Sequence, residues 1–485
     1  MSVLAERGSK VGRVVPNAPW PLKALGLVSE STDYVANGSF ASLKANVKYR
    51  SEPDHAVLVR FTDFAKGWKR NFVYVDEASF LFLKKSVLLP GDVVVSNVGD
   101  PGRVFRVPDL GRPMTLGPNA VLIRPYAELD RGFLAYFFSS PAGQALFASI
   151  TTGTAQRKFN KTTLRKLEVP LPPLPDQRRI VAEIEKQFTR LDAGVAALRR
   201  TQANLKRYRA AVLKAACEGR LVPTEAELHR QLGTKNSKLE TGEALLRGIL
   251  AERRQNWQGC GKYKDPTAPD TTNLPPIPGG WTWANVEQLL REPLCNGVSV
   301  KGSDNPPGVR ALRLSAMSNS GFDYSDVRYL PLAELDVDDL WIEEGDFFMS
   351  RGNGSLHLVG RGTPAQKPIQ PTIFPDTMIR LRLSNKIGPS GWIRMLWPSR
   401  IVRSQIETRV KTTAGIYKIA QPQVEGMVIP LPPLAEQTRI VAEVERRLSV
   451  VEELETVVTA NLQRASRLRQ AVLQRAFTGK QKSAS

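Results

Sequence analysis

Apolar residues recur at alternating intervals of four and three positions in two long segments, residues 175–220 and 435–479. This spacing is typical of the buried seam between paired helices. In the first segment the seam positions are Ile184, Phe188, Leu191, Val195, Leu198, Leu205 and Val212. In the second they are Val444, Leu448, Val451, Val458, Leu462, Ala465 and Val472. We expect two helices of about 40 residues, or roughly 60 Å, that pair in antiparallel fashion; the alternative is that each helix packs only on its own lobe.

Residues that cannot continue a helix bound both segments. Prolines within residues 172–175 exclude a helix before them and form an extended lead-in. Asp176, and Glu436 in the second segment, bring an acidic group to the first helical turn, where the helix dipole favours it. Gly219 and Gly479 stand where a C-terminal cap is expected.

The two segments are copies of one another. Residues 169–185 recur as residues 429–445, which is 429 − 169 = 260 positions later, and the match runs without a gap to the capping glycines. The regions before each copy are related more loosely: Gly91-Asp92 parallels Gly345-Asp346, and each region begins at a tryptophan expected to anchor a core, Trp20 or Trp281. We interpret the chain as an internal duplication.

The predicted fold class is therefore mixed α/β (α+β), with two lobes separated by two long helices in an antiparallel coiled coil and related by a pseudo-twofold. The expected boundaries are 1–174 for the first lobe, 175–220 for the first helix, 221–274 for a linker, 275–434 for the second lobe, 435–479 for the second helix and 480–485 for a tail.

Composition narrows the class of partner. The chain has 485 residues, too many for one ordinary core, and carries 68 Lys and Arg against 47 Asp and Glu, a formal charge of +21. Such an excess favours a polyanionic partner, most often nucleic acid, over a merely basic or ribosome-associated protein. No apolar run reaches the roughly 18 residues of a membrane span, and the first residues lack the apolar core of a signal peptide. We therefore expect no membrane partner. Three scattered cysteines (Cys217, Cys260, Cys295) fit a reducing compartment, and we expect a cytoplasmic location.

Motifs for catalysis are not found. The nearest match to an adenine methyltransferase loop, residues 305–308, ends in glycine and has no ring to stack on a base. Gly479-Lys480 lacks the remainder of a P-loop, and the glycines at 352 and 354 lack dinucleotide-binding spacing, so we interpret the latter as a tight turn. The histidines at 55, 229 and 357 are far apart, and no metal site is expected. Two hypotheses stay open: a DNA-sequence reader that positions enzymes made by other chains, or a divergent self-contained DNA methyltransferase or nuclease with its own cofactor or metal.

The repeated motifs resemble a known family. Leu171-Pro172-Pro173-Leu174 with Gln177 and Arg179, and the matching residues 431–439, are similar to conserved regions of type I restriction–modification specificity subunits. The glycine–aspartate steps, the loop Gly153-Thr154-Ala155-Gln156 and the spacer at 242–264 resemble that family too, so the likeness spans essentially the whole chain. The second lobe departs from it, since residues 413–417 read Thr-Ala-Gly-Ile-Tyr.

The resemblance implies a non-catalytic subunit whose lobes each read half of a bipartite site in double-stranded DNA. It implies that the helices set the gap and dock two methyltransferase (modification) subunits, and that two restriction/translocase subunits complete the complex. The chain itself would hold no cofactor; S-adenosylmethionine, ATP and magnesium are expected on the partners.

Candidate DNA-binding residues are cations for phosphates and amides for base edges, although a charge cluster is usually only a solvated surface. In the first lobe they are Lys66, Lys69, Arg70, Asn71, Gln156, Arg157, Lys158 and Lys161. In the second they are Arg351, Asn353, Lys411, Tyr417 and Lys418.

Overall fold

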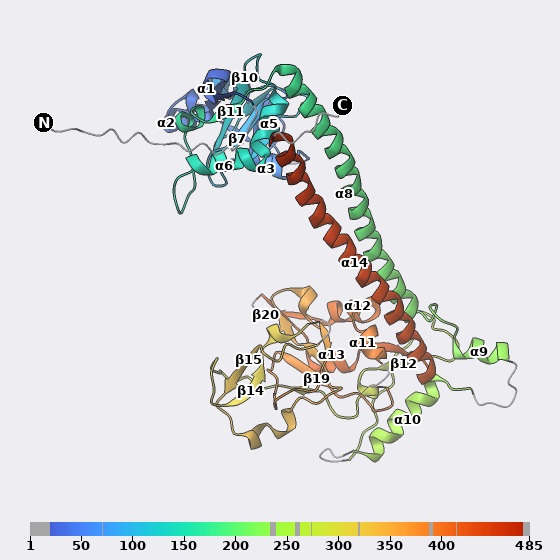
Figure 1. Ribbon diagram of the computed structural model, residues 1–485. Coiled ribbons are helices and arrows are strands. Elements are labelled where there is room, and N and C mark those ends of the chain that lie inside the picture. The colour runs from blue at the N-terminus through green and yellow to red at the C-terminus, as the bar shows by residue number, and fades with distance from the viewer. Residues whose placement is uncertain are drawn as a thin grey trace. The chain divides into compact units, whose positions relative to one another are not determined.

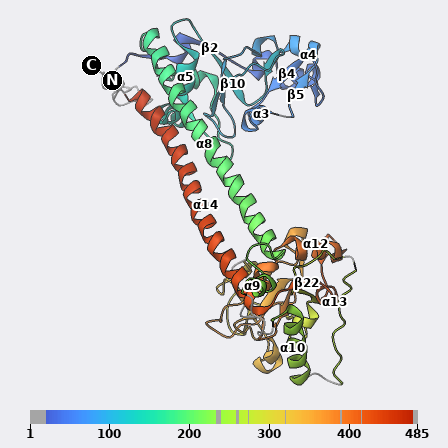
Figure 2. The ribbon, with the colours of Figure 1, turned by 90° about the vertical axis from the view of Figure 1, so that its right-hand side faces the viewer.

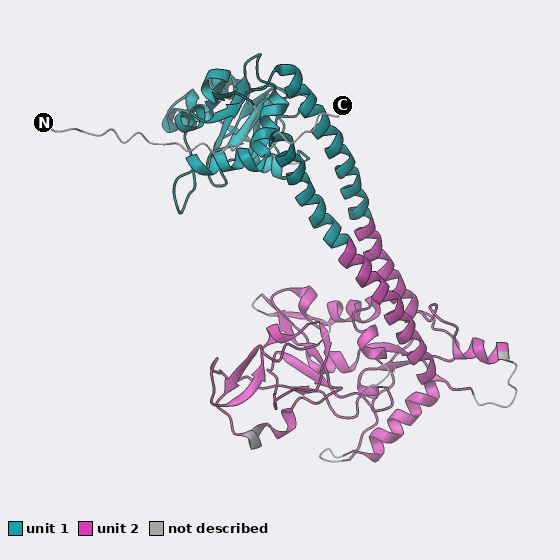
Figure 3. Cartoon of the chain, in the orientation of Figure 1, with its two compact units in different colours: residues 1–200, 458–485 teal, residues 201–457 magenta. Residues whose placement is uncertain are grey.

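The computed structural model describes residues 20–69, 71–232, 239–257, 262–272, 274–318, 321–387, 391–413 and 415–478. The chain divides into two compact units, coloured separately in Figure 3. Unit 1 comprises residues 1–200 with 458–485, and unit 2 comprises residues 201–457. Each unit therefore holds one lobe together with parts of both long helices (Figure 1).

The lobe of unit 1 is built on two sheets. Its four-stranded sheet is antiparallel throughout and runs, in spatial order, through β2 (Ser29–Asp33), β10 (Ala120–Pro125), β7 (Val93–Ser96) and β8 (Val104–Arg106). Its five-stranded sheet contains one parallel pair, β4 with β9, and runs through β3 (Tyr49–Arg50), β5 (Val73–Val75), β4 (Ala56–Val59), β9 (Met114–Leu116) and β6 (Val87–Leu88). A further pair joins β1 (Leu22–Ala24) to β11 (Glu168–Pro170), which brings the start of the lobe to the residues before the first long helix.

Aromatic packing between helices and the four-stranded sheet forms the main core of unit 1. Phe133, Phe137 and Phe138 from α5 and Phe147 from α6 are almost fully buried. The lobe's helices are α1 (Leu25–Val28), α2 (Phe40–Asn46), α3 (Phe61–Ala65), α4 (Glu77–Phe82), α5 (Arg131–Ser139), α6 (Pro141–Ile150) and α7 (Lys161–Arg165), with 3₁₀ turns at Tyr34–Asn37 and Lys84–Ser86. Trp20 packs edge-on against Phe133, so its predicted role as a core anchor is confirmed.

Unit 2 repeats the four-stranded sheet. In spatial order its strands are β13 (Cys295–Asn296), β19 (Met378–Leu381), β16 (Phe347–Ser350) and β18 (Gly362–Pro364). Smaller sheets pair β12 (Thr282–Asn285) with β22 (Val428–Leu431), pair β14 (Val309–Leu312) with β15 (Val327–Leu330), and join β17 (Gly352–Asn353), β21 (Ile416–Lys418) and β20 (Lys411–Thr413). Its shorter helices are α9 (Glu225–Leu232), α10 (Gly242–Gln255), α11 (Trp392–Leu396), α12 (Arg400–Arg409) and α13 (Gln421–Glu425), with 3₁₀ turns at Glu287–Leu289, Leu314–Ala316, Glu334–Leu340 and Leu356–Leu358.

The segment expected as a linker contributes to the core of unit 2. Leu246 and Ile249 of α10 are buried in the same cluster as Trp281, and Arg253 donates a hydrogen bond to the carbonyl of Glu287. Trp281 is 7% exposed and lies edge-on to Trp392, which confirms the predicted anchor of the second lobe.

Two long helices of 44 residues each, α8 (Leu174–Cys217) and α14 (Leu434–Phe477), are the copies seen in the sequence. They lie side by side in both views (Figures 1 and 2). Within unit 1, Arg469 pairs with Asp192 at 2.7 Å; within unit 2, Arg209 pairs with Glu452 at 3.3 Å. In each pair a residue early in one helix meets one late in the other, so the predicted antiparallel pairing is confirmed. Every seam position named above is buried or half-buried.

The first long helix ends as its sequence predicts. Gly219 has φ of +64°. Its N–H donates to the carbonyl of Ala216, and the N–H of Arg220 donates to the carbonyl of Ala215. These two bonds form a Schellman cap, which glycine favours because it carries no Cβ. Gly479, the expected cap of the second helix, lies outside the described residues.

The glycine–aspartate steps fix equivalent turns in the two lobes. Asp92 accepts a hydrogen bond from the N–H of Leu89 and one from Arg124 of β10, at 2.9 and 3.1 Å. Asp346 accepts from the N–H of Glu343 and from Arg382, at 3.0 and 2.8 Å. Both carboxylates are buried, so each is held by a charged partner inside its lobe.

Candidate DNA-binding site

Four of the five candidate residues of the second lobe lie on one small sheet, and the fifth, Arg351, adjoins it. Within it Asn353 of β17 pairs with Tyr417 of β21, and Lys418 faces Gly352 on one side and Lys411 of β20 on the other. Arg351 immediately precedes β17. Lys411 and Lys418 are exposed, and Asn353 and Tyr417 are half-buried, so this sheet offers cations, an amide and an aromatic ring on neighbouring strands.

The glycine-containing segment at 352–354 differs from the sequence prediction. A tight turn was expected, but Gly352–Asn353 form a short strand paired with β21. The physical reason is non-local: residues 416–418, some sixty positions further on, supply the hydrogen-bonding edge that makes an extended conformation favourable.

An equivalent loop exists in the first lobe. Lys158 forms backbone bridges to Val98, just after β7, and to Thr152. Adding the repeat offset, 158 + 260 = 418, so Lys158 corresponds to Lys418, whose partner Gly352 likewise follows the matching strand β16. Each lobe therefore presents a lysine at the same point of the same fold.

The other candidates of this loop divide into free and paired groups. Gln156, Arg157 and Lys158 are exposed. The ammonium of Lys161 instead lies 2.8 Å from a carboxylate oxygen of Asp33, at the end of β2. Because Asp33 already balances its charge, Lys161 is less available to a phosphate than its neighbours are.

The remaining first-lobe candidates follow α3. Lys66, Lys69 and Asn71 are exposed, and Asn71 has φ of +62°; Arg70 lies outside the described residues. Trp68, between the lysines, packs edge-on against Phe105 of β8 with ring centres 5.2 Å apart. The aromatic ring anchors the loop and leaves its cations in solvent.

The turn between β7 and β8 lies between these two basic loops. The N–H of Gly99 binds the carbonyl of Arg157 at 3.0 Å. At the other end of the turn, the guanidinium of Arg103 lies 5.9 Å from the ring centre of Phe64 in α3. The structure thus brings together two clusters that are some ninety positions apart in the sequence.

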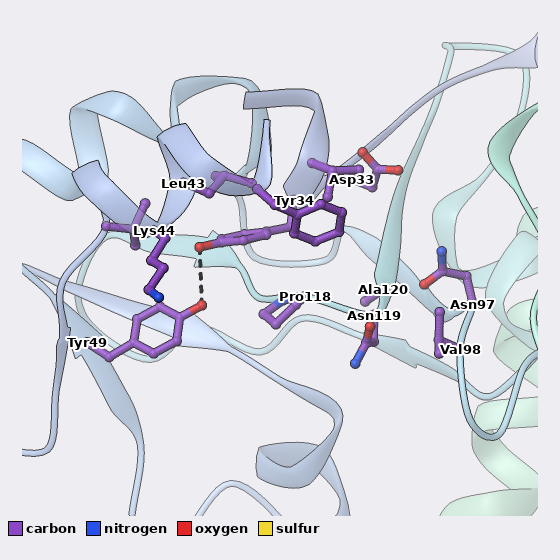
Figure 4. A pocket seen from close by; sticks show the side chains of 13 residues that line it. Asp33, Tyr34, Leu43, Lys44, Tyr49, Asn97, Val98, Pro118, Asn119 and Ala120 are labelled. Carbon is purple, nitrogen blue, oxygen red and sulfur yellow. Dashed lines mark hydrogen bonds between the residues drawn. The ribbon is translucent and has the colours of Figure 1, made fainter. Parts of the chain in front are cut away.

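A pocket of about 600 Å³ beside the 156–158 loop was not found from the sequence. Tyr34 and Tyr49 meet there with their hydroxyl oxygens 3.1 Å apart, and Asn97 and Asn119 also line the pocket (Figure 4). Burial raises the pKa of Tyr34, and the hydrogen bond with Tyr49 raises it further. These residues come from separate segments with no recurring spacing, so no sequence pattern could have grouped them.

The described residues offer neither a metal site nor a membrane-spanning helix. Within the parts of the chain that the structure describes, no three or more His, Cys, Asp or Glu side chains gather as a metal site would require. No described helix is both long and apolar enough to cross a membrane.

Comparison with known proteins gives a consistent result. Residues 70–200 match the family model described as "Type I restriction modification DNA specificity domain". The chain is 25% identical to the type I restriction enzyme EcoKI specificity subunit of Escherichia coli (strain K12), over 88% of this chain and 82% of that protein. It is 24% identical to the StySPI specificity subunit of Salmonella potsdam, over 88% and 83%.

One solved structure supports the fold. It is described as "Structural basis underlying complex assembly and conformational transition of the type I R-M system", and its chain superposes with a TM-score of 0.59 at 18% identity, covering 96% of this chain and 99% of that one. The matched specificity domain and relatives aligned over most of their length agree with the duplicated architecture: the chain is similar to type I restriction–modification specificity subunits.

Proposed function

We propose that this chain is the DNA-recognition subunit of a type I restriction–modification complex, and that each lobe reads one half of a bipartite site. One observation carries the proposal. Lys158 and Lys418 stand at equivalent points of the two lobes, on loops joined to equivalent strands, while the residues around them differ. A shared backbone position with divergent side chains is what two readers of different half-sites require.

Specificity subunits carry no reaction of their own, and this chain is non-catalytic. On this proposal S-adenosylmethionine, ATP and magnesium are held by partner subunits, two for modification and two for restriction and translocation. The location in the cytoplasm stays a prediction from the sequence.

The long helices supply a surface for the modification subunits. The seam between the helices is occupied, because its residues are buried or half-buried, so docking falls to other helix faces. On α14, Val450, Leu454 and Val457 are 51%, 45% and 50% exposed and recur at intervals of four and three. An exposed apolar stripe of this kind marks a protein interface.

Co-purification tests this surface. Leu454→Asp should abolish co-purification with the modification subunit, because it places a charge in an apolar contact. Gln463→Asp, at an exposed polar position of the same helix, is the matched control and should leave assembly intact. Equal retention by both variants would contradict docking on this stripe.

Methylation of a randomised DNA library tests the reading function. With the modification subunits and labelled S-adenosylmethionine, the methylated sites should share two short blocks around a fixed gap. Exchanging the first lobe for that of a relative should change one block only. A change in both blocks would contradict the modular proposal, and shortening both helices by one turn should alter the gap or abolish activity.

The alternative, a self-contained methyltransferase or nuclease, is tested in the same experiment. Methylation by this chain without partners would establish that alternative. Methylation that depends on both components would exclude it.

A further inference from the structure

The pocket of the first lobe has the chemistry of a nucleobase site. Its aromatic side chains are Tyr34, Tyr49 and Phe40, the last two 54% and 81% exposed, and Leu43 and Pro118 add apolar surface. Aromatic rings next to apolar walls stack planar bases irrespective of sequence. At about 600 Å³ the pocket has ample room for a base with its sugar.

Asn97 supplies an unpartnered polar atom at the pocket. Its side-chain oxygen is shielded from solvent and has no hydrogen-bond partner among the described residues. Figure 4 shows that oxygen on the side of Asn97 that faces Asn119 and Ala120, which also line the pocket. A buried acceptor without a donor is unfavourable, and a donor on the ligand would satisfy it. An asparagine amide is well suited to this task because it can bond the edge of an adenine through two atoms.

The pocket adjoins the basic loop that the proposed function assigns to DNA. The carbonyl of Asn97 accepts the N–H of Phe159 at 3.1 Å, and Val98 forms a backbone bridge with Lys158. A phosphate held by exposed Arg157 and Lys158 would place its own nucleotide beside the pocket mouth.

In the second lobe, described residues of the chain itself pack into the space that corresponds to the pocket. Strand pairing makes Asn296 the equivalent of Asp33: Asp33 faces Val121 of β10, and Asn296 faces Ile379 at the matching place in β19. The next residue is Tyr34 in the first lobe and Gly297 in the second.

Residues 374–376 occupy the space in the second lobe. A Cβ on Gly297 would lie 2.0 Å from the carbonyl oxygen of Phe374, and Val298 bonds both Phe374 and Asp376 through its backbone. The guanidinium of Arg351, the equivalent of Asn97, donates to the carbonyl of Asp376 at 3.3 Å. The difference between the lobes is therefore structural and local.

We infer that the first-lobe pocket receives one unstacked nucleobase of the target DNA, stacked on Tyr49 and Phe40 and identified by the Asn97 amide. This inference rests on the proposed function and deepens it, since it names the residues through which one half-site position is read. A base that leaves the duplex loses its stacking there, and the stacking and hydrogen bonds of the pocket would offset that loss.

The first test is the base preference of the assembled complex. Asn97→Ala should relax the preference at one position of one half-site by about ten- to a hundredfold and leave the other half-site unchanged. Because the Asn97 oxygen is buried without a hydrogen-bond partner among the described residues, the variant should not lower the melting temperature. Lys158→Ala is the contrasting variant: it should lower affinity for all sequences and reduce the salt dependence of binding, with no change in preference.

The second test is a thermodynamic cycle on the wild-type target. Removing the identified base (an abasic nucleotide) and Tyr49→Ala should each weaken binding, but together should cost no more than the larger single change, because both remove the same contact. A free nucleoside monophosphate added at millimolar concentration should not compete, since the loop's phosphate contacts belong to the duplex; competition would assign the pocket to free nucleotides and overturn the inference.

The outcomes separate the two proposals. A wild-type complex without any bipartite preference would refute the proposed function. A bipartite preference that Asn97→Ala leaves intact, or strictly additive effects in the cycle, would refute the pocket alone.

Discussion

In the first lobe the chain continues from β2 into Tyr34 and leaves an open pocket, whereas in the second lobe the same point is Gly297 and residues 374–376 fill the space. The two lobes otherwise share the order of their four-stranded sheets and the aspartate-held turn. The two copies thus share their four-stranded sheets and differ in the segments that follow β2 and β13. This difference lies next to the loop that carries Lys158, one of the candidate DNA-binding residues.

The shared frame should respond most strongly to loss of its buried ion pairs. Asp92→Ala should destabilise the first lobe by about 3–5 kcal/mol, because it removes the buried carboxylate that binds both Arg124 and the N–H of Leu89. Asp346→Ala should cost the second lobe less, since Arg382 keeps its ion pairs with Glu292 and Glu343 at 3.1 and 2.8 Å. Calorimetric unfolding of both variants measures the difference, and equal losses would contradict this account of the frame.

The next largest loss of stability is expected for a substitution at Gly297, where residues 374–376 pack against the chain. Gly297→Ala places a Cβ against the carbonyl of Phe374, so the chain at 374–376 must shift, at a cost of about 1–3 kcal/mol. Gly279→Ala, where a Cβ would meet nothing within 4 Å, is the matched control and should change stability little. A tolerated Gly297→Ala would mean that the space is not closed and that the contrast between the lobes is weaker than described.

The two long helices and the cap of the first one could be predicted from the sequence, because residues close together in the chain determine them. The apolar spacing and prolines predicted both long helices, and the cap at Gly219 follows from one residue's conformational freedom. Four of the second-lobe candidates, including Tyr417, lie together on one sheet, although they were selected by residue type.

The ion pair of Lys161 and the first-lobe pocket could not be predicted, because both depend on contacts between segments that are distant in the sequence. Lys161 was predicted as a DNA-binding cation, yet it pairs with Asp33, 128 positions away. The pocket joins Tyr34, Tyr49, Asn97 and Asn119, which no periodicity connects. The sequence shows which cations could bind a phosphate. Only the tertiary structure shows which of them are already paired with a carboxylate.

Glu436, in the first turn of the second long helix, should make the stability of the second lobe depend on pH. Burial raises the pKa of Glu436 above its ordinary value, opposed by hydrogen bonds from the Glu225 N–H and the Trp281 indole. The folded chain thus holds this proton more tightly than the unfolded chain does. Its contribution to stability is therefore full below pH 4.5, the ordinary value, and is lost as the pH rises through the raised pKa.

Glu436→Gln should remove this loss, since glutamine keeps an acceptor for Trp281 without a charge. Unfolding measured from pH 4 to pH 8 should show a flatter profile than the wild type, by less than the Gly297→Ala effect. Asp176→Asn, at the half-exposed equivalent position of the first helix, is the control and should leave the profile of the second lobe unchanged. An identical slope in Glu436→Gln and wild type would show that the group does not titrate as described.

The smallest expected effect compares the two ion pairs of the helix pair. Arg209–Glu452 and Arg469–Asp192 are both largely exposed, so each coupling should be about 0.2–1 kcal/mol in a double-mutant cycle and should weaken in high salt. Arg469 differs in also lying over the ring of Phe188, 4.1 Å from its centre. Arg469→Ala should therefore cost more than Arg209→Ala, and the excess should survive in 1 M salt, because ring stacking is screened less than an exposed charge pair. If salt removed the whole difference, the ring contact would contribute nothing, and the two halves of the helix pair would be held by equivalent surface charges.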